Sequence, residues 1–93
     1  MKHSVKNIFF HELIGLDIEL IDYPDTKLVG LKGRIVDETR KTIVVETNGR
    51  IVRVFKENSI LKITIPSGET VLVRGFELMG RPEDRLKKIV KRG

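Results

Sequence analysis

The stretch TIVVETNGRIVRVF, residues 42–55, decides the fold. Asn48 and Gly49 stand at its centre, and this pair is typical of a type I′ turn, because both central residues of such a turn need positive φ. Apolar, β-branched runs flank the pair, so the stretch predicts a tight β-hairpin. In two-residue register Val45 faces Val52, which gives the hairpin one core face and one mixed face.

Short strand patterns continue on both sides of this hairpin. Residues 17–21 and 28–37 precede it and are separated by a turn signal at residues 23–25. Residues 60–65 and 70–74 follow it as a second predicted hairpin around a Pro-Ser-Gly-Glu turn. Five to six short strands with closely spaced turns and no long helix between them are typical of a small antiparallel barrel.

Two glycines bear on the shape of that barrel. Gly30 and Gly33 lie within the second predicted strand. Glycines inside an apolar strand usually mark a bend or a bulge, and a strongly bent strand is what a small closed barrel needs at its corners. We therefore assign both glycines to barrel curvature.

Helical patterns are expected only at the two ends of the chain. Residues 7–14 carry apolar positions at i, i+3 and i+4 before Gly15, which predicts two helical turns. Arg81-Pro82-Glu83-Asp84 starts a second predicted helix that runs to about Arg92, because Pro and acidic residues suit a first helical turn. The expected organisation is a helical lead-in (1–16), a barrel (17–75) and a helical tail (76–93) within a single domain.

Composition narrows the class of protein. The 93 residues support one modest core, and 40% hydrophobic with 33% charged residues is a globular balance. Cysteine is absent, which excludes disulfides, thiolate metal sites and cysteine nucleophiles. No apolar run is long enough to span a membrane, and the first ten residues lack a signal-peptide pattern, so we expect a cytoplasmic protein.

Charge points to a polyanionic partner. The formal net charge is +5, and the sequence pI is about 9.7. The charge is also segregated, since residues 11–26 hold five acidic residues and no Lys or Arg, whereas 27–53 and 81–93 are both strongly basic. Two basic blocks around an acidic one suit two different partners, although an ordinary solvated surface explains segregation alone about as well.

Catalytic and metal-binding patterns are weak. His3 and His11 are too few for a metal site, and no His-x-x-x-His or Cys pair is present. Asp37-Glu38 could hold a divalent ion or act as a general base, but an acidic pair after a strand more often forms a turn. We expect no catalytic residues, no metal ligands and no cofactor in this chain.

RNA binding through the phosphate backbone is the favoured interpretation. The five aromatic residues, at positions 9, 10, 23, 55 and 76, are mostly expected in the core, so no platform for base stacking is predicted. Basic side chains on the central strands and near the tail would instead contact phosphates. The candidate RNA-binding residues are Arg34, Arg40, Lys41, Arg50, Arg53, Lys56, Lys62, Arg74, Arg81, Arg85, Lys87 and Lys88.

Three blocks carry a family resemblance. They are HELIGL at residues 11–16, GLKGRIVDET at 30–39 and RPEDR at 81–85. In this order and spacing the chain resembles the archaeal ribonuclease P protein component 1 family, whose eukaryotic relative is a subunit of ribonuclease P and MRP. The likeness covers about residues 8–92. Residues 54–61 depart from the family pattern, in which a more basic, Gly-containing stretch is expected.

The resemblance implies a fold and a role. The implied fold is an Sm-like or SH3-like barrel of about six strands with flanking helices. The implied role is a non-catalytic subunit of the ribonucleoprotein that removes the 5′ leader of precursor tRNA, in which the RNA is the catalyst and magnesium belongs to the RNA. Such a subunit binds the RNA specificity domain together with a zinc-ribbon subunit, protein component 4, and meets other ribonuclease P proteins and, indirectly, precursor tRNA.

A partner surface is expected in the acidic segment near the N-terminus, where it would dock the basic zinc-ribbon subunit. The candidate partner-binding residues are Phe10, Leu13, Ile14, Leu16, Asp17 and Glu19. Two other classes stay open: a binding module of another ribonucleoprotein, such as a ribosomal SH3-like protein or an Sm-type ring former, and an enzyme in its own right.

Overall fold

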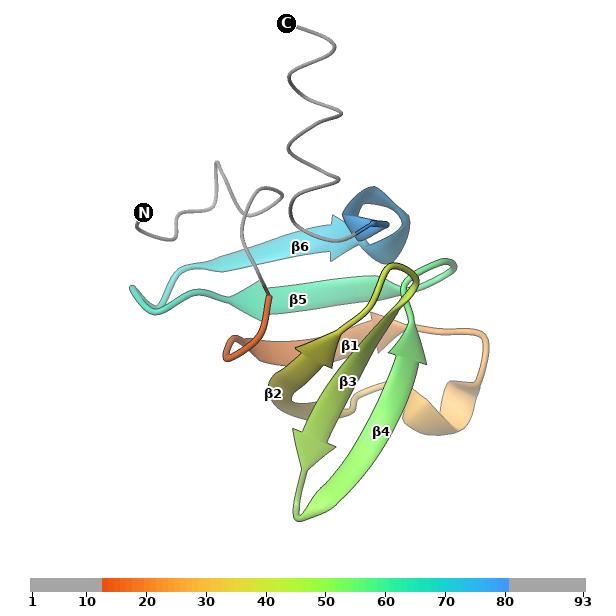
Figure 1. Cartoon of the computed structure of the whole chain (residues 1–93), viewed down its shortest axis with the longest axis horizontal. Helices are drawn as coiled ribbons and strands as arrows, with labels where there is room; N and C mark the ends of the chain where they lie inside the picture. The colour runs from red at the N-terminus through yellow and green to blue at the C-terminus, as the bar shows by residue number, and fades with distance from the viewer. Residues whose placement is uncertain (1–12, 81–93) are drawn as a thin grey trace, which may run out of the picture.

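The computed structural model describes residues 13–80 of the 93-residue chain. Six antiparallel strands form one sheet (Figure 1). The strands are β1 (Asp17–Asp22), β2 (Lys32–Glu38), β3 (Thr42–Thr47), β4 (Arg50–Phe55), β5 (Ile60–Thr64) and β6 (Thr70–Arg74). Single turns of 3-10 helix, η2 (Thr26–Leu28) and η3 (Gly75–Leu78), precede β2 and follow β6.

The two predicted hairpins are confirmed. In the β3–β4 hairpin Val45 lies opposite Val52, and Asn48 (φ 49°) and Gly49 (φ 78°) take the left-handed conformation that the turn requires. Strands β5 and β6 pair over their whole length. Both hairpins follow from local sequence, because turn chemistry and β-branched side chains act over a few residues.

The sheet is open, so the prediction of a closed barrel is wrong. Its strand order is β4-β3-β2-β1-β5-β6, which leaves β4 and β6 as the two edges. At the end of β4 the outward N–H of Phe55 donates to the hydroxyl of Tyr23 (3.0 Å) and not to a strand. In a closed barrel this N–H would donate to a backbone carbonyl oxygen of a neighbouring strand, but here it donates to a side chain.

The sheet is nevertheless strongly bent, and β2 to β4 cross β5 and β6 at a steep angle (Figure 1). Register shifts interrupt the ladders between Ile35 and Asp37 and between Leu20 and Asp22. Gly33 brings β2 close to β3, since a Cβ there would collide with a backbone carbonyl oxygen of β3. The predicted second strand begins only at residue 32, so Gly30 lies in the preceding turn (φ 92°) and not inside a bent strand.

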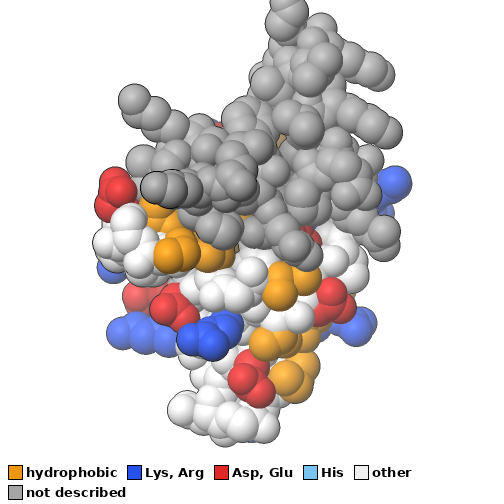
Figure 2. Space-filling model, turned by 60° about the vertical axis from the view of Figure 1, so that its left-hand side comes forward, with side chains coloured by type: hydrophobic (Ala, Val, Ile, Leu, Met, Phe, Trp, Pro, Cys, Tyr) orange, Lys and Arg blue, Asp and Glu red, His pale blue; other side chains and the backbone are white. Residues whose placement is uncertain are grey.

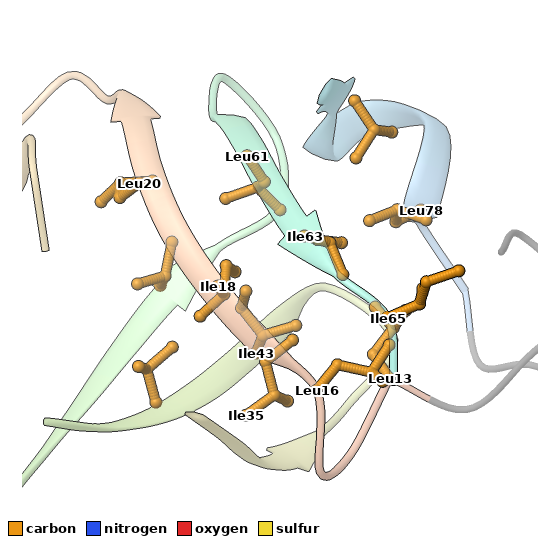
Figure 3. Packing of buried hydrophobic residues seen from close by; sticks show 13 residues of the cluster. Leu13, Leu16, Ile18, Leu20, Ile35, Ile43, Leu61, Ile63, Ile65 and Leu78 are labelled. Atoms are coloured by element: carbon orange, nitrogen blue, oxygen red, sulfur yellow. The ribbon is translucent and has the colours of Figure 1, made fainter. Parts of the chain in front are cut away.

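The hydrophobic core fills the inner side of the bend (Figure 3). All described strands contribute aliphatic side chains to it. Its members are Leu13, Leu16, Ile18, Leu20, Ile35, Ile43, Val45, Val54, Leu61, Ile63, Ile65, Val73 and Leu78. Because this layer is aliphatic and one-sided, every functional group of the sheet must lie on the outer face, on the edges or in the loops.

The predicted terminal helices fall almost entirely outside the described residues. Residues 7–12 and 81–92 are not described, and residues 13–16 form a turn that leads into β1. Between residues 13 and 80 the only helical elements are the two 3-10 turns. In the same range no helix is long and apolar enough to cross a membrane.

Candidate nucleic-acid interface

The fold interleaves the charge blocks that are separate in the sequence. Acidic β1 lies between β2 and β5, so Glu19 faces Lys32 on one side and Lys62 on the other. Asp17 lies opposite Arg34, and the Arg34 Nε is 3.8 Å from the Asp17 Oδ1. Opposite charges on neighbouring strands attract weakly at an exposed site. The acidic segment is therefore not a purely acidic surface.

A shallow groove of about 580 Å³ runs over this central part of the sheet. Its charged lining residues are Asp17, Glu19, Lys32, Arg34, Glu46 and Lys62. Three acidic and three basic side chains balance one another there, so the groove is neutral. On the face shown in Figure 2, acidic and basic side chains are likewise interspersed. Of the RNA-binding candidates, Arg34 and Lys62 thus share their surface with carboxylates that repel phosphate.

A second group of basic side chains forms no ion pair among the described residues. Arg50 and Arg53 lie on the edge strand β4, and Arg40 and Lys41 lie on the turn between β2 and β3. All four residues are exposed, and none takes part in the ion pairs of the described region. We call these four residues the β4 strip. They are the described cations best placed to attract a polyanion.

The remaining RNA-binding candidates are scattered. Arg74 is exposed on β6, the opposite edge of the sheet, where its Nε is 3.9 Å from the Glu77 Oε1. Arg81, Arg85, Lys87 and Lys88 lie outside the described residues. The predicted set is therefore not one continuous patch across the part of the chain that the structure describes.

Lys56 must be withdrawn from the RNA-binding set, because its side chain is fully buried. Its ammonium group is 2.7 Å from the Glu38 Oε2 and donates to the carbonyl oxygens of Thr39 (2.8 Å), Arg40 (3.4 Å) and Gly80 (2.9 Å). Burying a lysine requires such a cage of acceptors. Lys56 is an internal cross-link that no RNA can reach in this fold.

The same ion pair ties together several distant segments. The other oxygen of Glu38, Oε1, accepts from the backbone N–H of Leu13 (3.3 Å). Gly80 also donates its N–H to the carbonyl oxygen of Arg40 (2.8 Å). We name the ion pair of Glu38 and Lys56 with these contacts the buried clasp. It joins both ends of the described chain to the turn that carries Arg40 and Lys41, and no local sequence pattern predicts it.

The predicted partner surface is only partly exposed. Leu13 and Leu16 are buried in the core of the chain itself (Figure 3) and must be withdrawn as docking residues. Ile14 and Asp17 are exposed, and Glu19 is half-buried. Phe10 lies outside the described residues. Leu13 and Leu16 instead anchor the lead-in segment to the core of the sheet.

The aromatic residues also differ from expectation. Phe55 and Phe76 are exposed to 56% and 67%, so neither belongs to the core. Tyr23 is half-buried and packs against it. The alternation of a strand does not reveal whether its outer face is covered, which is why the exposure of Phe55 on β4 escaped the sequence pattern.

The acidic pair Asp37-Glu38 is divided by the fold. The Asp37 Oδ1 accepts from the backbone N–H of Glu38 (2.8 Å), while the Glu38 carboxylate points inward to Lys56. The two carboxylates therefore face different surroundings. Among the described residues no group of three or more His, Cys, Asp or Glu side chains comes together as a metal site.

Comparison with known proteins identifies the family. The family model for the ribonuclease P/MRP subunit p29 matches residues 6–88. The chain belongs to this family. Ribonuclease P protein component 1 of Staphylothermus marinus is 55% identical over 92 residues, which cover 98% of this chain and 100% of that protein. The protein of the same name from Desulfurococcus amylolyticus is 54% identical over 90 residues, or 96% of this chain and 98% of that protein.

A solved structure agrees with the family assignment. It is Mth11, described as a homologue of the human RNase P protein Rpp29, with a TM-score of 0.60 and 39% identity. The match covers 81% of this chain and 97% of Mth11. The predicted family is thus confirmed, and this member of the p29 family is a ribonuclease P protein subunit of the archaeal kind.

Proposed function

We propose that this subunit is a non-catalytic RNA-binding component of ribonuclease P, which removes the 5′ leader of precursor tRNA. Membership of the p29 family over most of the chain is the observation that carries the proposal. The described residues add a basic edge and no converging catalytic groups. The RNA then performs the cleavage and holds the magnesium, while the protein acts in the cytoplasm by binding RNA.

The RNA-binding surface is the β4 strip, reinforced by the basic tail. Four exposed cations lie on or beside this edge, and none of them forms an ion pair among the described residues, whereas Arg34 lies beside Asp17 in the neutral groove. Such contacts position the protein on folded RNA and read its shape. The RNA bound in this way is the specificity domain of the ribonuclease P RNA.

The zinc-ribbon subunit, protein component 4, docks at the acidic start of β1. Ile14 and Asp17 are exposed at the start of β1, next to the half-buried Glu19. An exposed aliphatic side chain beside carboxylates suits a basic partner with an apolar contact. Other ribonuclease P proteins and precursor tRNA meet this subunit within the assembled particle.

The decisive test is cleavage of precursor tRNA by an archaeal ribonuclease P RNA over a range of magnesium concentrations. We expect this chain together with the zinc-ribbon subunit to lower the magnesium requirement or the KM for substrate. The chain alone should cleave nothing. Cleavage by the purified chain, lost in Asp37→Asn, would instead identify an enzyme, and the absence of any effect on the RNA would refute the proposal.

A pair of variants separates the β4 strip from the neutral groove. Each phosphate contact contributes about 0.7 to 0.9 to the slope of log affinity against log salt. We expect Arg53→Gln to reduce that slope by nearly one unit, whereas Arg34→Gln, the matched control beside Asp17, changes it less. Equal effects of the two substitutions would argue against the β4 strip as the RNA-binding edge.

A further inference from the structure

A groove at one end of β4 combines aromatic, apolar and polar side chains. Its volume is about 450 Å³, within the range of small-ligand sites. The lining residues are Tyr23, Pro24, Asp25, Lys41, Phe55, Glu57, Asn58 and Met79. It is separate from the neutral groove over β1, with which it shares no lining residue.

Two aromatic side chains, those of Tyr23 and Phe55, line this groove. Phe55 exposes 56% of its surface although it ends a regular strand. Tyr23 is half-buried, and its hydroxyl accepts the hydrogen bond from the backbone N–H of Phe55 (3.0 Å). This bond fixes the phenol of the β1–β2 connection against the end of the edge strand, so both rings line one preformed site.

We propose that this groove receives one unstacked nucleobase of the RNA, which stacks on Phe55. The inference rests on the proposed RNA-binding function and goes beyond it, because phosphate contacts alone require no exposed ring. An aromatic face provides stacking energy for any base, and the groove provides walls that exclude water around it. The bound nucleotide comes from a single-stranded loop or bulge, since a paired base cannot enter.

The charges around Phe55 fit a nucleotide. Arg53 lies two residues before Phe55 on the same face of β4, and Lys41 lines the groove itself. The Lys41 carbonyl oxygen accepts from the N–H of residue 56 (2.8 Å), which keeps the β2–β3 turn beside the end of β4. The phosphates on either side of a flipped base thus meet two cations of the β4 strip.

The acidic and amide side chains of the groove suit the base and not the phosphates. Asp25 already uses its Oδ1 to accept the N–H of Lys27 at the start of η2 (3.1 Å). Glu57 and Asn58 are exposed at the groove and offer acceptors for the N–H donors of a base edge. A partner protein rich in Lys would be attracted by Asp25 and Glu57 but repelled by Arg53 and Lys41.

The test compares Phe55→Leu with Phe76→Leu in the full-length chain. Both residues are exposed phenylalanines, but only Phe55 lines the groove. The probes are the ribonuclease P RNA and a short single-stranded RNA, with a duplex of the same sequence as the paired control. We expect Phe55→Leu to weaken binding to the single strand by about five- to a hundredfold, Phe55→Trp to retain it, and Phe76→Leu to leave it unchanged.

A second readout does not depend on affinity. The chain has one Tyr and no Trp, so its intrinsic fluorescence reports Tyr23 alone. We expect the single strand to quench this fluorescence and ultraviolet irradiation to cross-link a base to Phe55 or Tyr23, with neither effect for the duplex. If RNA binds with strong salt dependence but Phe55→Leu, quenching and cross-linking show nothing, the base site is refuted while the proposed function stands.

Two further outcomes also overturn the inference. If Phe55→Leu weakens binding of the zinc-ribbon subunit and not of RNA, the groove is a protein-docking site. If neither RNA probe binds the full-length chain at any salt concentration, alone or with the zinc-ribbon subunit, the proposed function and the base site fail together. Unchanged melting curves for the three variants would establish that each result comes from the surface and not from unfolding.

Discussion

Breaking the buried clasp should be one of the most destabilising single changes in this fold. Lys56→Met removes the ammonium group but keeps a long unbranched side chain in the same space. The carboxylate of Glu38 then loses a partner 2.7 Å away, and the carbonyl oxygens of Thr39 and Gly80 lose a donor within 3.0 Å. Removing one member of a buried ion pair costs about 3–5 kcal/mol.

That loss is large for a chain of this size. A domain of this length is stable by roughly 5–14 kcal/mol, so the substitution removes about a fifth of the total or more. With a urea m-value of about 1.5 kcal/mol/M, the unfolding midpoint should fall by roughly 2–3 M. The measurement is urea unfolding followed by far-ultraviolet circular dichroism and by the fluorescence of the single tyrosine.

Two controls make the reasoning refutable. Lys62→Met removes an exposed lysine of β5 and should change stability by less than about 0.5 kcal/mol. The double variant Lys56→Met/Glu38→Leu removes both charges. Its loss of unfolding free energy should be smaller than the sum of the two single losses by about 1.5–3 kcal/mol. A Lys56→Met protein as stable as Lys62→Met would show that Lys56 is not buried with Glu38 in solution.

Three further predictions follow from particular contacts. Gly75→Ala should destabilise the fold by about 1–3 kcal/mol in urea unfolding, because a Cβ at this position would collide with the carbonyl oxygen of Lys56. A variant as stable as the wild type would contradict the close approach of Gly75 to that oxygen. Tyr23→Phe should cost about 1 kcal/mol in the same assay, since the N–H of Phe55 loses its acceptor; no loss would mean that water replaces the hydroxyl fully. RNA affinity should fall about a hundredfold or more between about 50 and 200 mM salt if five phosphates are contacted, and a flat response in a filter-binding titration would contradict backbone recognition.

The features that could be predicted from the sequence are those set by neighbouring residues. The Asn48-Gly49 turn, the facing of Val45 and Val52 and the β5–β6 hairpin all depend on residues close together in the chain. Family membership was also predictable, because the three blocks at residues 11–16, 30–39 and 81–85 carried the resemblance, and the family model matches residues 6–88. None of these features requires knowledge of which strands meet at long range.

The features that could not be predicted depend on long-range pairing. Glu38 and Lys56 look like surface residues until the fold buries them against each other across 18 positions. The alternation of apolar and polar residues places Phe55 on the outer face of β4. Only the strand order shows that β4 is an edge strand of the sheet. The segregation of charge along the sequence disappears for the same reason, because β1 pairs with both β2 and β5.

The buried clasp holds part of the β4 strip in place. The ammonium of Lys56 binds the carbonyl oxygens of Thr39 and Arg40, so an internal cation fixes the turn that presents Arg40 and Lys41 to solvent. The same clasp holds the backbone at Leu13 and Gly80, the two ends of the described chain. Both ends of the described chain therefore lie at the corner that carries Arg40 and Lys41. Loss of the clasp should consequently weaken RNA binding beyond what loss of stability explains, because the cations would remain but their common frame would not.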